Sequence, residues 1–520
     1  MGGGSKLARV YSAAVQGVEA MEVEIEVSGG AGDMSQIVIV GLPDVAVRES
    51  RDRVGTALGN SGFKRPFGRY TINLAPADIR KEGPSFDLPI AIGMVGLEEE
   101  FDRERLEKCC IVGELALDGR IRPVKGVLSL ALEARARGRK AILVPRENAF
   151  EAALVEGIHV YGVESLRQSV DLIRGQGGPE ATCFDRESFF DVHRRYDIDF
   201  ADVKGQAHVK RALEVAVAGN HNVLLIGPPG TGKSMLAKRV ASIMPMMTED
   251  EAIEATKIHS IAGVLDTGEG FLATRPFRSP HHTISDVGLL GGSANPSPGE
   301  VSLAHNGVLF LDELPEFRRS TLEVLRQPLE DGKVTVSRAA GTMTFPARFM
   351  LVAAMNPCPC GYHGDLKREC RCSPNMVQKY RQRISGPLLD RVDLHVEVPV
   401  VEYKELAGES GGESSDVVRA RVERARDVQR ERYRWMGPEG TSLHNAQMNP
   451  KMMKEFCAID AESGALLEQA MGELNFSARA HDRILKVART LADLAGEEKI
   501  AADHVLEAIQ YRTLDRSLWV

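Results

Sequence analysis

The sequence predicts a multidomain α/β protein, and three observations support this fold class. The chain has 520 residues, which at roughly 100–200 residues per domain is enough for three or four domains. Short apolar runs typical of strands alternate with helical stretches up to about residue 400. Residues 449–520 have the spacing of several amphipathic helices, with Gly464 and Gly472 expected as breaks between them.

Composition excludes several classes of protein. Lys and Arg number 65 against 73 Asp and Glu, a formal net charge of −8, so the chain is not a basic coat for nucleic acid or anionic lipid. If the protein binds such a polyanion, it must do so through a local basic surface. The sequence contains no apolar run of 18 residues and no secretion signal, so we expect no contact with a membrane. Eight cysteines are too few for a disulfide scaffold, which favours the cytoplasm.

Residues 1–175 are expected to form one α+β domain. Val23–Val27 alternates apolar and acidic residues, as a half-buried strand does, and Ala141–Val144 is typical of a buried strand. Val45–Leu58 has helical spacing. Residues 176–198 are polar and poorly periodic, and several glycines mark their start, so we expect an interdomain linker there.

A glycine-rich loop between a strand and a helix is the most specific motif in the chain. It matches G-x-x-x-x-G-K-[ST] and follows the apolar strand Val223–Ile226. Its glycines let backbone N–H groups converge on phosphate oxygens at a helix N-terminus. We expect Lys233 to reach the β- and γ-phosphates and Ser234 to hold Mg²⁺. The ATP-binding residues of this loop are Gly227, Pro228, Pro229, Gly230, Thr231, Gly232, Lys233 and Ser234.

Two further apolar runs end in polar side chains. Val308–Leu311 predicts a buried strand followed by Asp312 and Glu313, a second pair of candidate site residues. Asp312 is expected in the Mg²⁺ shell, and Glu313 is expected to polarise the attacking water. The run Phe349–Ala354 leads to Asn356, which can orient water and sense the γ-phosphate; a simple turn before proline is the alternative.

These motifs resemble an AAA+ ATPase of the magnesium-chelatase/MCM-like branch, and the YifB/ComM family most of all. The resemblance covers nearly the whole chain. Besides the three motifs above, it depends on V-G-L-P-D at 40–44, R-P-F-R-S-P-H-H at 275–282, N-P-C-P-C-G-Y at 356–362, G-P-L-L-D-R-V-D-L at 386–394 and N-F-S-A-R-A at 475–480.

The resemblance implies roles for four more residues. Gly205 and Gln206 match the segment that lines the adenine pocket, where glycine allows close backbone approach. Arg391 matches an arginine finger, which contacts the ATP bound to a neighbouring subunit. Arg479 matches the sensor-2 arginine of a helical lid. Each would add positive charge where the transferred phosphoryl group spreads negative charge. A finger acting in trans implies a homohexameric ring, whereas purely structural salt bridges are the alternative.

The resemblance also implies a division of the chain after the linker. Residues 199–400 form the AAA+ core, 401–448 a linker and charged helix, and 449–520 the helical lid. Residues 259–300 resemble the helix-2 insertion, and residues 332–345 read as a hairpin that resembles the pre-sensor-1 hairpin of related rings. Lys333 and Arg338 on this hairpin are the candidate DNA contacts, repeated around a ring; solvated surface cations are the alternative.

Half of the cysteines lie within fifteen residues. Cys358, Cys360, Cys370 and Cys372 could close a tetrahedral Zn²⁺ site, because a metal can order a short polar insertion that has no core. Their C-x-C spacing is less common than C-x-x-C, so reduced structural thiols remain the alternative.

The first domain resembles the Lon protease domain through K-E-G-P-S-F-D-L-P at 81–89 and G-E-L-A-L-D-G-R-I-R-P-V at 113–124. Ser85 matches the nucleophile. The position of the lysine base is occupied by Leu128, which cannot accept a proton, and Lys125 is expected to face elsewhere. We therefore expect a Lon-like fold without peptidase activity, with Ser85 as a helix cap or phosphate contact.

The function that these features favour is an ATP-dependent hexameric DNA motor, a helicase or branch-migration translocase that acts on single-stranded, forked or branched DNA. The resemblance links such a motor to integration of incoming DNA in natural transformation. A magnesium-chelatase-type remodelling ATPase and a regulatory ATPase without motor action are the alternatives. A Lon-like protease is disfavoured by Leu128.

Overall fold

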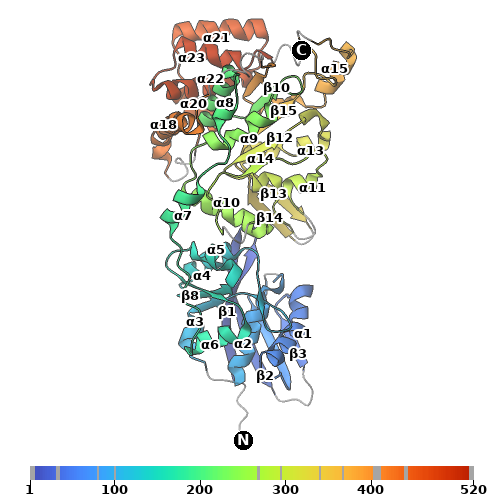
Figure 1. The fold of residues 1–520 in the computed structure, drawn as a ribbon, viewed down its shortest axis with the longest axis vertical. Helices are drawn as coiled ribbons and strands as arrows, with labels where there is room; N and C mark the ends of the chain where they lie inside the picture. Colours follow the sequence, from blue (N-terminus) through green and yellow to red (C-terminus); the bar gives the residue numbers. More distant parts are fainter. Residues whose placement is uncertain are drawn as a thin grey trace. The chain divides into compact units, whose positions relative to one another are not determined.

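The chain divides into two units between His193 and Arg194 (Figure 1). Unit 1 contains Met1–His193 together with Ile253–Leu272, and unit 2 contains Arg194–Ala252 and Ala273–Val520. The computed structural model describes residues 6–30, 36–78, 81–98, 101–265, 270–292, 296–338, 341–365, 368–401, 412–437 and 443–514. Within this part of the chain, no helix combines the length and hydropathy needed to cross a bilayer.

Unit 1 is built on a seven-stranded mixed sheet in the order β3-β4-β2-β1-β5-β8-β9. β1 and β2 form a long antiparallel hairpin, and β4 continues it on the β2 side. Each of the other strands is parallel to its neighbour: β3 to β4, β5 to β1, β8 to β5, and β9 to β8. The strands are β1 (Lys6–Gln16), β2 (Glu19–Gly30), β3 (Gln36–Val40), β4 (Arg69–Ala75), β5 (Cys109–Ile111), β8 (Ala141–Pro145) and β9 (His159–Val163), and a small ribbon pairs β6 (Glu114–Leu115) with β7 (Ile121–Arg122).

Helices cover this sheet and close its core. Both α2 and α4 pack against β1 and β2, and α2 is nearly all buried because its sequence is apolar on every side. Asp87 begins α2 inside the core, where Arg53 donates to it at 2.8 Å. The helices of this unit are α1 (Val45–Asn60), α2 (Asp87–Glu98), α3 (Arg103–Glu107), α4 (Val127–Ala136), α5 (Ala149–Ala153), α6 (Leu166–Arg174) and α7 (Arg186–His193).

A segment from the middle of the sequence completes unit 1. Helix α10 (Glu249–Ala262) begins in unit 2, and from Ile253 onward it belongs to unit 1. Its Ser260 hydroxyl donates to the buried carboxylate of Glu151 and accepts from the backbone N–H of Gly126 at 2.9 Å. Burial raises the pKa of Glu151, although the hydrogen bonds from Ser260 and from the Leu128 backbone oppose that rise.

Unit 2 contains a five-stranded sheet in the order β11-β12-β15-β10-β16, in which every neighbouring pair is parallel. β10, β12 and β15 are completely buried, as their unbroken apolar sequences require. The strands are β10 (Val223–Ile226), β11 (Phe277–Arg278), β12 (Val308–Leu311), β15 (Met350–Met355) and β16 (Leu394–Glu397). An α/β protein with a parallel sheet and a helical C-terminal region, as the sequence predicts, is therefore confirmed.

The helices of unit 2 fall into two groups. Those before residue 400 flank the sheet: α8 (Ala207–Gly219), α9 (Lys233–Ile243), α11 (Asp286–Leu290), α12 (Glu300–Leu303), α13 (Arg319–Glu323), α14 (Arg326–Asp331), α15 (Pro374–Arg381) and α16 (Gly386–Leu389). The later helices lie together and are coloured orange to red in Figure 1: α18 (Ser415–Tyr433), α20 (Pro450–Phe456), α21 (Ala461–Leu474), α22 (Ala478–Ala495) and α23 (Ala502–Gln510). α22 and α18 pack on α8, so one apolar core joins this group to the sheet.

Two details of unit 2 concern the sequence predictions. The predicted hairpin is present, because β13 (Lys333–Arg338) pairs antiparallel with β14 (Gly341–Pro346). Gly464 and Gly472 were expected to interrupt the C-terminal helices, and this is wrong, since α21 runs through both. Each glycine costs about 1 kcal/mol relative to alanine in a helix, which the packing of buried Leu467 outweighs.

Candidate nucleotide site

The predicted phosphate loop lies between β10 and α9, at the carboxyl edge of the parallel sheet. Gly232 is the N-cap of α9 with φ 86°, a left-handed conformation that suits glycine, and no side chain caps the first N–H groups of the helix. Gly230 has a similar φ of 80°. The loop therefore leaves backbone donors at a helix N-terminus, where the helix dipole favours an anion such as phosphate.

Lys233 is enclosed by its own loop. Its ammonium donates to the carbonyls of Gly227 at 2.7 Å and Pro228 at 2.8 Å, and to Oδ1 of Asn356 at 3.2 Å. Burial lowers the pKa of Lys233 to about 8, and nearby Asp312 opposes this shift. The structure thus brings Lys233 and Asn356 together as the sequence predicts.

Ser234 and Asp312 provide two adjacent oxygen donors. The Ser234 hydroxyl donates to Oδ2 of Asp312 at 2.6 Å, which joins the start of α9 to the end of β12. Hydroxyl and carboxylate oxygens are ligands that Mg²⁺ prefers, and the ion usually keeps several waters besides. The donor set therefore fits a magnesium ion bound together with nucleotide phosphates.

Glu313 has an unusual backbone and a histidine neighbour. Its φ is 52°, a left-handed conformation that is uncommon for a non-glycine residue and often found at functional sites. Its carboxylate is half exposed and lies 3.4 Å from Nδ1 of His282. In the sequence, His282 stands out only as part of the R-P-F-R-S-P-H-H string. His282 follows β11, the strand beside β12, but β11 has only two residues, so the sequence carries no strand signal that would place His282 near Glu313.

The sheet register explains why these side chains meet. Ile226 at the end of β10 pairs with Met355 at the end of β15, so the phosphate loop and Asn356 both follow directly at the same edge of the sheet. Leu311 pairs with Ala353, which places Asp312 at the same edge. Ligands of open α/β sheets bind at the carboxyl ends of the strands.

Gln206 connects the segment before α8 to this loop. Its side-chain amide donates to the carbonyl of Thr231 at 2.9 Å and to that of Pro399 at 3.0 Å. Gly205 and Gln206 both have positive φ, 66° and 54°, so the chain turns sharply where the adenine pocket is expected.

The two candidate arginines make their contacts elsewhere in unit 2. Arg391 is 8% exposed, and its guanidinium contacts Glu330 of α14 and the carbonyl of Pro387. Arg479, at the start of α22, donates to Asp390 at 2.5 Å and is well exposed. Among the described residues, neither arginine contacts a member of the Lys233 site, so the structure does not bring either one to that site of its own chain.

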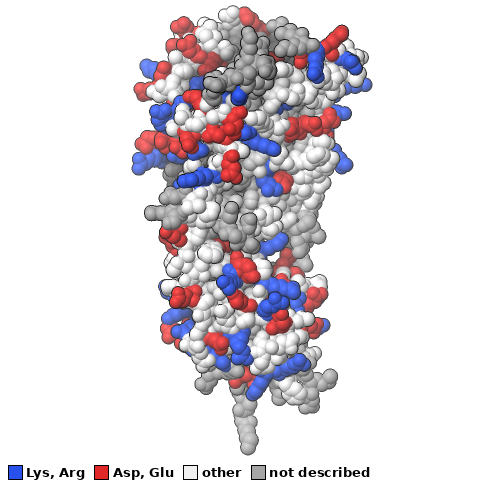
Figure 2. Space-filling model, in the orientation of Figure 1, with Lys and Arg blue, Asp and Glu red and all other residues white. Residues whose placement is uncertain are grey.

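The candidate DNA contacts lie on the β13–β14 hairpin. Lys333 is exposed at its base and pairs in register with Pro346. Arg338 ends β13, and its side chain lies outside the described part, as do residues 339 and 340 at the tip. On the face drawn in Figure 2, the described Lys and Arg side chains are interspersed with Asp and Glu. Any basic surface on that face is therefore local, as the net charge of −8 suggests.

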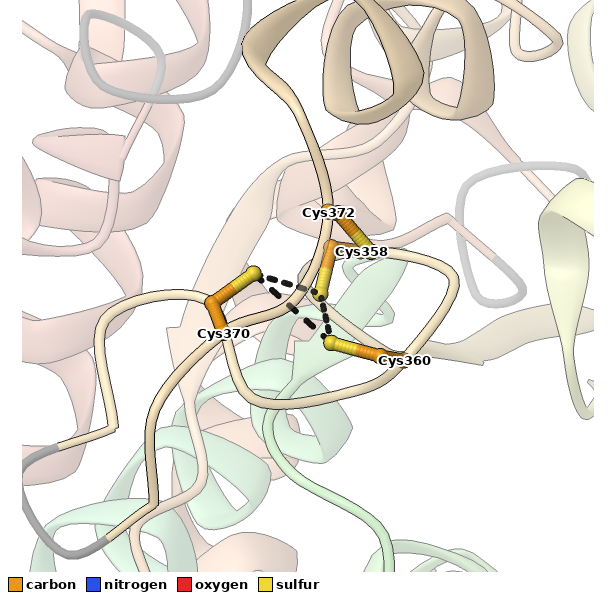
Figure 3. Close-up of side chains that lie close together, drawn as sticks. All are labelled: Cys358, Cys360, Cys370 and Cys372. Atoms are coloured by element: carbon orange, nitrogen blue, oxygen red, sulfur yellow. Dashed lines mark hydrogen bonds between the residues drawn. The ribbon is translucent and has the colours of Figure 1, made fainter.

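The four clustered cysteines converge in space (Figure 3). All four sulfur atoms lie within 4.8 Å of one another, and three of them are separated by 3.4 Å (Cys358–Cys360), 3.6 Å (Cys360–Cys370) and 3.8 Å (Cys358–Cys370). Backbone N–H groups of Tyr362 and Arg371 bond to the sulfur of Cys360 and lower the pKa of its thiol to about 6.

In unit 1, no described base forms a hydrogen bond with Ser85, the residue that matches the Lon nucleophile. Ser85 lies in a short 3₁₀ turn before α2, and its carbonyl accepts from Gly113 at 2.9 Å. Leu128 is fully buried in α4. Lys125 precedes that helix, and its ammonium lies 3.4 Å from the carbonyl of Ala262. The Lon-like character of this domain stays a prediction.

Comparison with known families gives three matches along the chain. Residues 23–148 match the family described as subunit ChlI of Mg-chelatase. Residues 199–406 match magnesium chelatase, subunit ChlI, and residues 412–512 match the C-terminal family of the same subunit.

Relatives of known name match over nearly the full length. The competence protein ComM of Haemophilus influenzae is 44% identical over 514 residues, which covers 98% of each chain. The uncharacterized protein YifB of Escherichia coli is 43% identical over 515 residues, again 98% of each chain. The magnesium-chelatase 38 kDa subunit of Rhodobacter capsulatus is more distant, at 25% identity over 328 residues, 59% of this chain and 84% of that one.

Proposed function

Because this chain belongs to the YifB/ComM family of magnesium-chelatase-like ATPases, we propose that it is an ATP-driven motor that moves along DNA. The observation that carries the ATPase part is the meeting of Lys233, Ser234, Asp312 and Asn356 at one edge of the parallel sheet. The cofactors are ATP with Mg²⁺ at this edge and Zn²⁺ at the cysteine cluster.

Each residue of the site has a definite task in this proposal. Lys233 and the loop N–H groups bind the phosphates, while Ser234 and Asp312 hold the magnesium ion. Glu313 accepts a proton from the attacking water, and Asn356 orients that water. Arg391 and Arg479 stabilise the charge that develops on the phosphoryl group. For Arg391 this requires release from Glu330 and a neighbouring subunit, so we propose a homohexameric ring.

The DNA part of the proposal is supported by the hairpin and by the relatives. The β13–β14 hairpin has exposed Lys333 at its base, and Arg338 follows five positions along the same strand. In a six-fold ring these cations would be repeated around one channel and would attract a phosphate backbone despite the overall negative charge. The full-length similarity to a competence protein supports a role in integrating incoming DNA during natural transformation.

A second candidate is a remodelling ATPase of the magnesium-chelatase type, which would act on a partner protein. The similarity to the magnesium-chelatase 38 kDa subunit favours it, because it extends over 84% of that chain. A DNA-independent ATPase would fit this candidate, or a regulatory ATPase, better than the motor.

The test is the ATPase rate with and without single-stranded, forked and four-way-junction DNA. We expect DNA to raise the rate of the wild-type protein, strands or junctions to be separated at the same time, and Lys233→Ala to have no turnover. The Lys333→Ala and Arg338→Ala variants should each lose most of the stimulation but keep the rate measured without DNA.

Lys454→Ala is the matched control, because Lys454 is an exposed lysine of unit 2 on α20, away from the hairpin. Equal stimulation of the hairpin variants and this control would contradict the channel assignment. A wild-type protein that hydrolyses ATP but shows neither stimulation nor unwinding would favour the second candidate.

A further inference from the structure

We propose that the four-cysteine loop is a zinc site whose ion holds the phosphate loop in its binding shape, so that zinc controls nucleotide affinity. This inference rests on the ATP-binding part of the proposed function. It concerns the segment between the end of β15 and the start of α15, which contains all four cysteines.

The sulfur geometry fits a tetrahedral metal. Four sulfurs at about 2.3 Å from a zinc ion lie about 3.8 Å from one another. The sulfur separations among Cys358, Cys360 and Cys370, 3.4, 3.6 and 3.8 Å, are close to that value, whereas a disulfide would require about 2.0 Å. The side chains also turn toward a common centre in Figure 3.

The loop has little other reason to hold this shape. Cys358 is fully buried, but the described residues from Gly364 to Ser373 are half-buried or exposed. A segment with so little apolar burial gains its order from a metal rather than from a core.

The same loop touches the phosphate loop. Gly361 has φ 86°, and a Cβ atom built on it would lie 2.6 Å from Cδ of Pro229. Its backbone therefore packs directly against the phosphate loop, one residue after Cys360. Cys358 follows Asn356 by two residues, and Asn356 accepts from Lys233 at 3.2 Å. The zinc ligands thus lie next to two parts of the nucleotide site, namely Pro229 of the phosphate loop and Asn356.

Loss of the ion should therefore loosen two groups that shape the nucleotide site. A misplacement of about 1 Å at a positioning group can lower a catalytic rate about 100-fold. We expect removal of zinc to weaken binding of ATP by about 10-fold or more while the parallel sheet stays folded.

The first experiment measures metal content and ATP affinity of the full chain purified without chelators. We expect about one zinc per chain by mass spectrometry of the metal, and a tight complex with a fluorescent ATP analogue. The double variant Cys360→Ser/Cys372→Ser should lose both. Cys183→Ser should lose neither, because Cys183 is an exposed cysteine of unit 1 outside the cluster.

A second pair of variants tests whether the contact between Gly361 and Pro229 affects ATP binding while the cysteine cluster stays folded. Gly361→Ala and Gly364→Ala introduce the same methyl group at nearly the same backbone conformation, φ 86° and 83°. Only at Gly361 does the methyl group meet Pro229, since Gly364 has open space within 4 Å. We expect both variants to keep zinc and only Gly361→Ala to bind ATP more weakly.

The outcomes are distinguishable. Zinc content near zero in the wild-type protein overturns the inference, as does undiminished ATP affinity after a chelator has removed the ion. Equal ATP affinity of the Gly361 and Gly364 variants overturns the contact with Pro229. A wild-type protein that carries zinc but does not bind ATP overturns the proposed ATPase itself.

Discussion

Lys233 has its ammonium group enclosed by carbonyl oxygens of its own loop, and burial lowers its pKa to about 8. A triphosphate beside the ammonium would stabilise the charged form and raise the pKa again. The empty and the nucleotide-bound site therefore differ in their protonation at slightly alkaline pH.

Proton uptake on ATP binding should follow from this difference. At pH 8 about half of the free sites have a neutral Lys233, so binding should take up about half a proton per chain, and almost none at pH 6.5. Calorimetry in buffers of different ionisation enthalpy measures the uptake. Lys233→Arg should abolish it, because arginine stays charged. Uptake that is the same at both pH values would contradict this assignment.

At the residue scale, the sequence was enough to predict that side chains following the buried strands lie together at one edge of the sheet. Lys233, Asp312 and Asn356 each end or follow an apolar run, and parallel pairing brings such positions together. His282 was not identified, because β11 has only two residues and gives no strand signal in the sequence. The partners of Arg391 could not be predicted either, since Glu330 lies 61 residues away on a separate short helix.

At the scale of elements, strands with unbroken apolar sequences were predictable, whereas breaks in helices were not. Glycine lowers helix propensity, yet α21 runs through Gly464 and Gly472 because packing of its buried face, which includes Leu467, stabilises the helix. A Cβ at either glycine would meet only open space. Local preference is here outweighed by packing, which the sequence alone does not display.

Gly464→Ala and Gly472→Ala should therefore each stabilise α21 by about 0.5–1 kcal/mol. The same substitution at Gly496 should destabilise the end of α22 by about 1 kcal/mol, because Gly496 is its C-cap with φ 73°. Amide hydrogen exchange of each helix measures the change. Faster exchange in α21 of the first two variants would contradict the explanation.

At the scale of the whole molecule, the proposed ring depends on Arg391. In the single chain this arginine is buried against Glu330, and its Nε has no hydrogen-bond partner among the described residues. A buried guanidinium with an unmet donor is costly, so a phosphate oxygen from a neighbouring subunit could satisfy it better.

Mixing two inactive variants tests this role. Arg391→Ala should bind ATP without hydrolysing it, and Glu313→Gln should do the same for a different reason, the loss of the base. Mixed rings should regain part of the turnover at interfaces that combine an intact arginine with an intact glutamate. Glu330→Gln is the control, because it removes the negative charge that pairs with Arg391 and should leave turnover intact. No recovery on mixing, or equal loss in Glu330→Gln, would favour a purely structural ion pair.

The contribution of residues 253–272 to unit 1 has a consequence for how the protein is made. The ribosome delivers the chain from its N-terminus, so Glu151 is synthesised about a hundred residues before Ser260, its partner. During that interval β10 and α9 are also made. The N-terminal unit therefore reaches its final form only after the phosphate loop exists, and a chain that stops at residue 193 would leave a buried carboxylate without one of its donors. Unit 1 is therefore completed only after part of unit 2 has been synthesised.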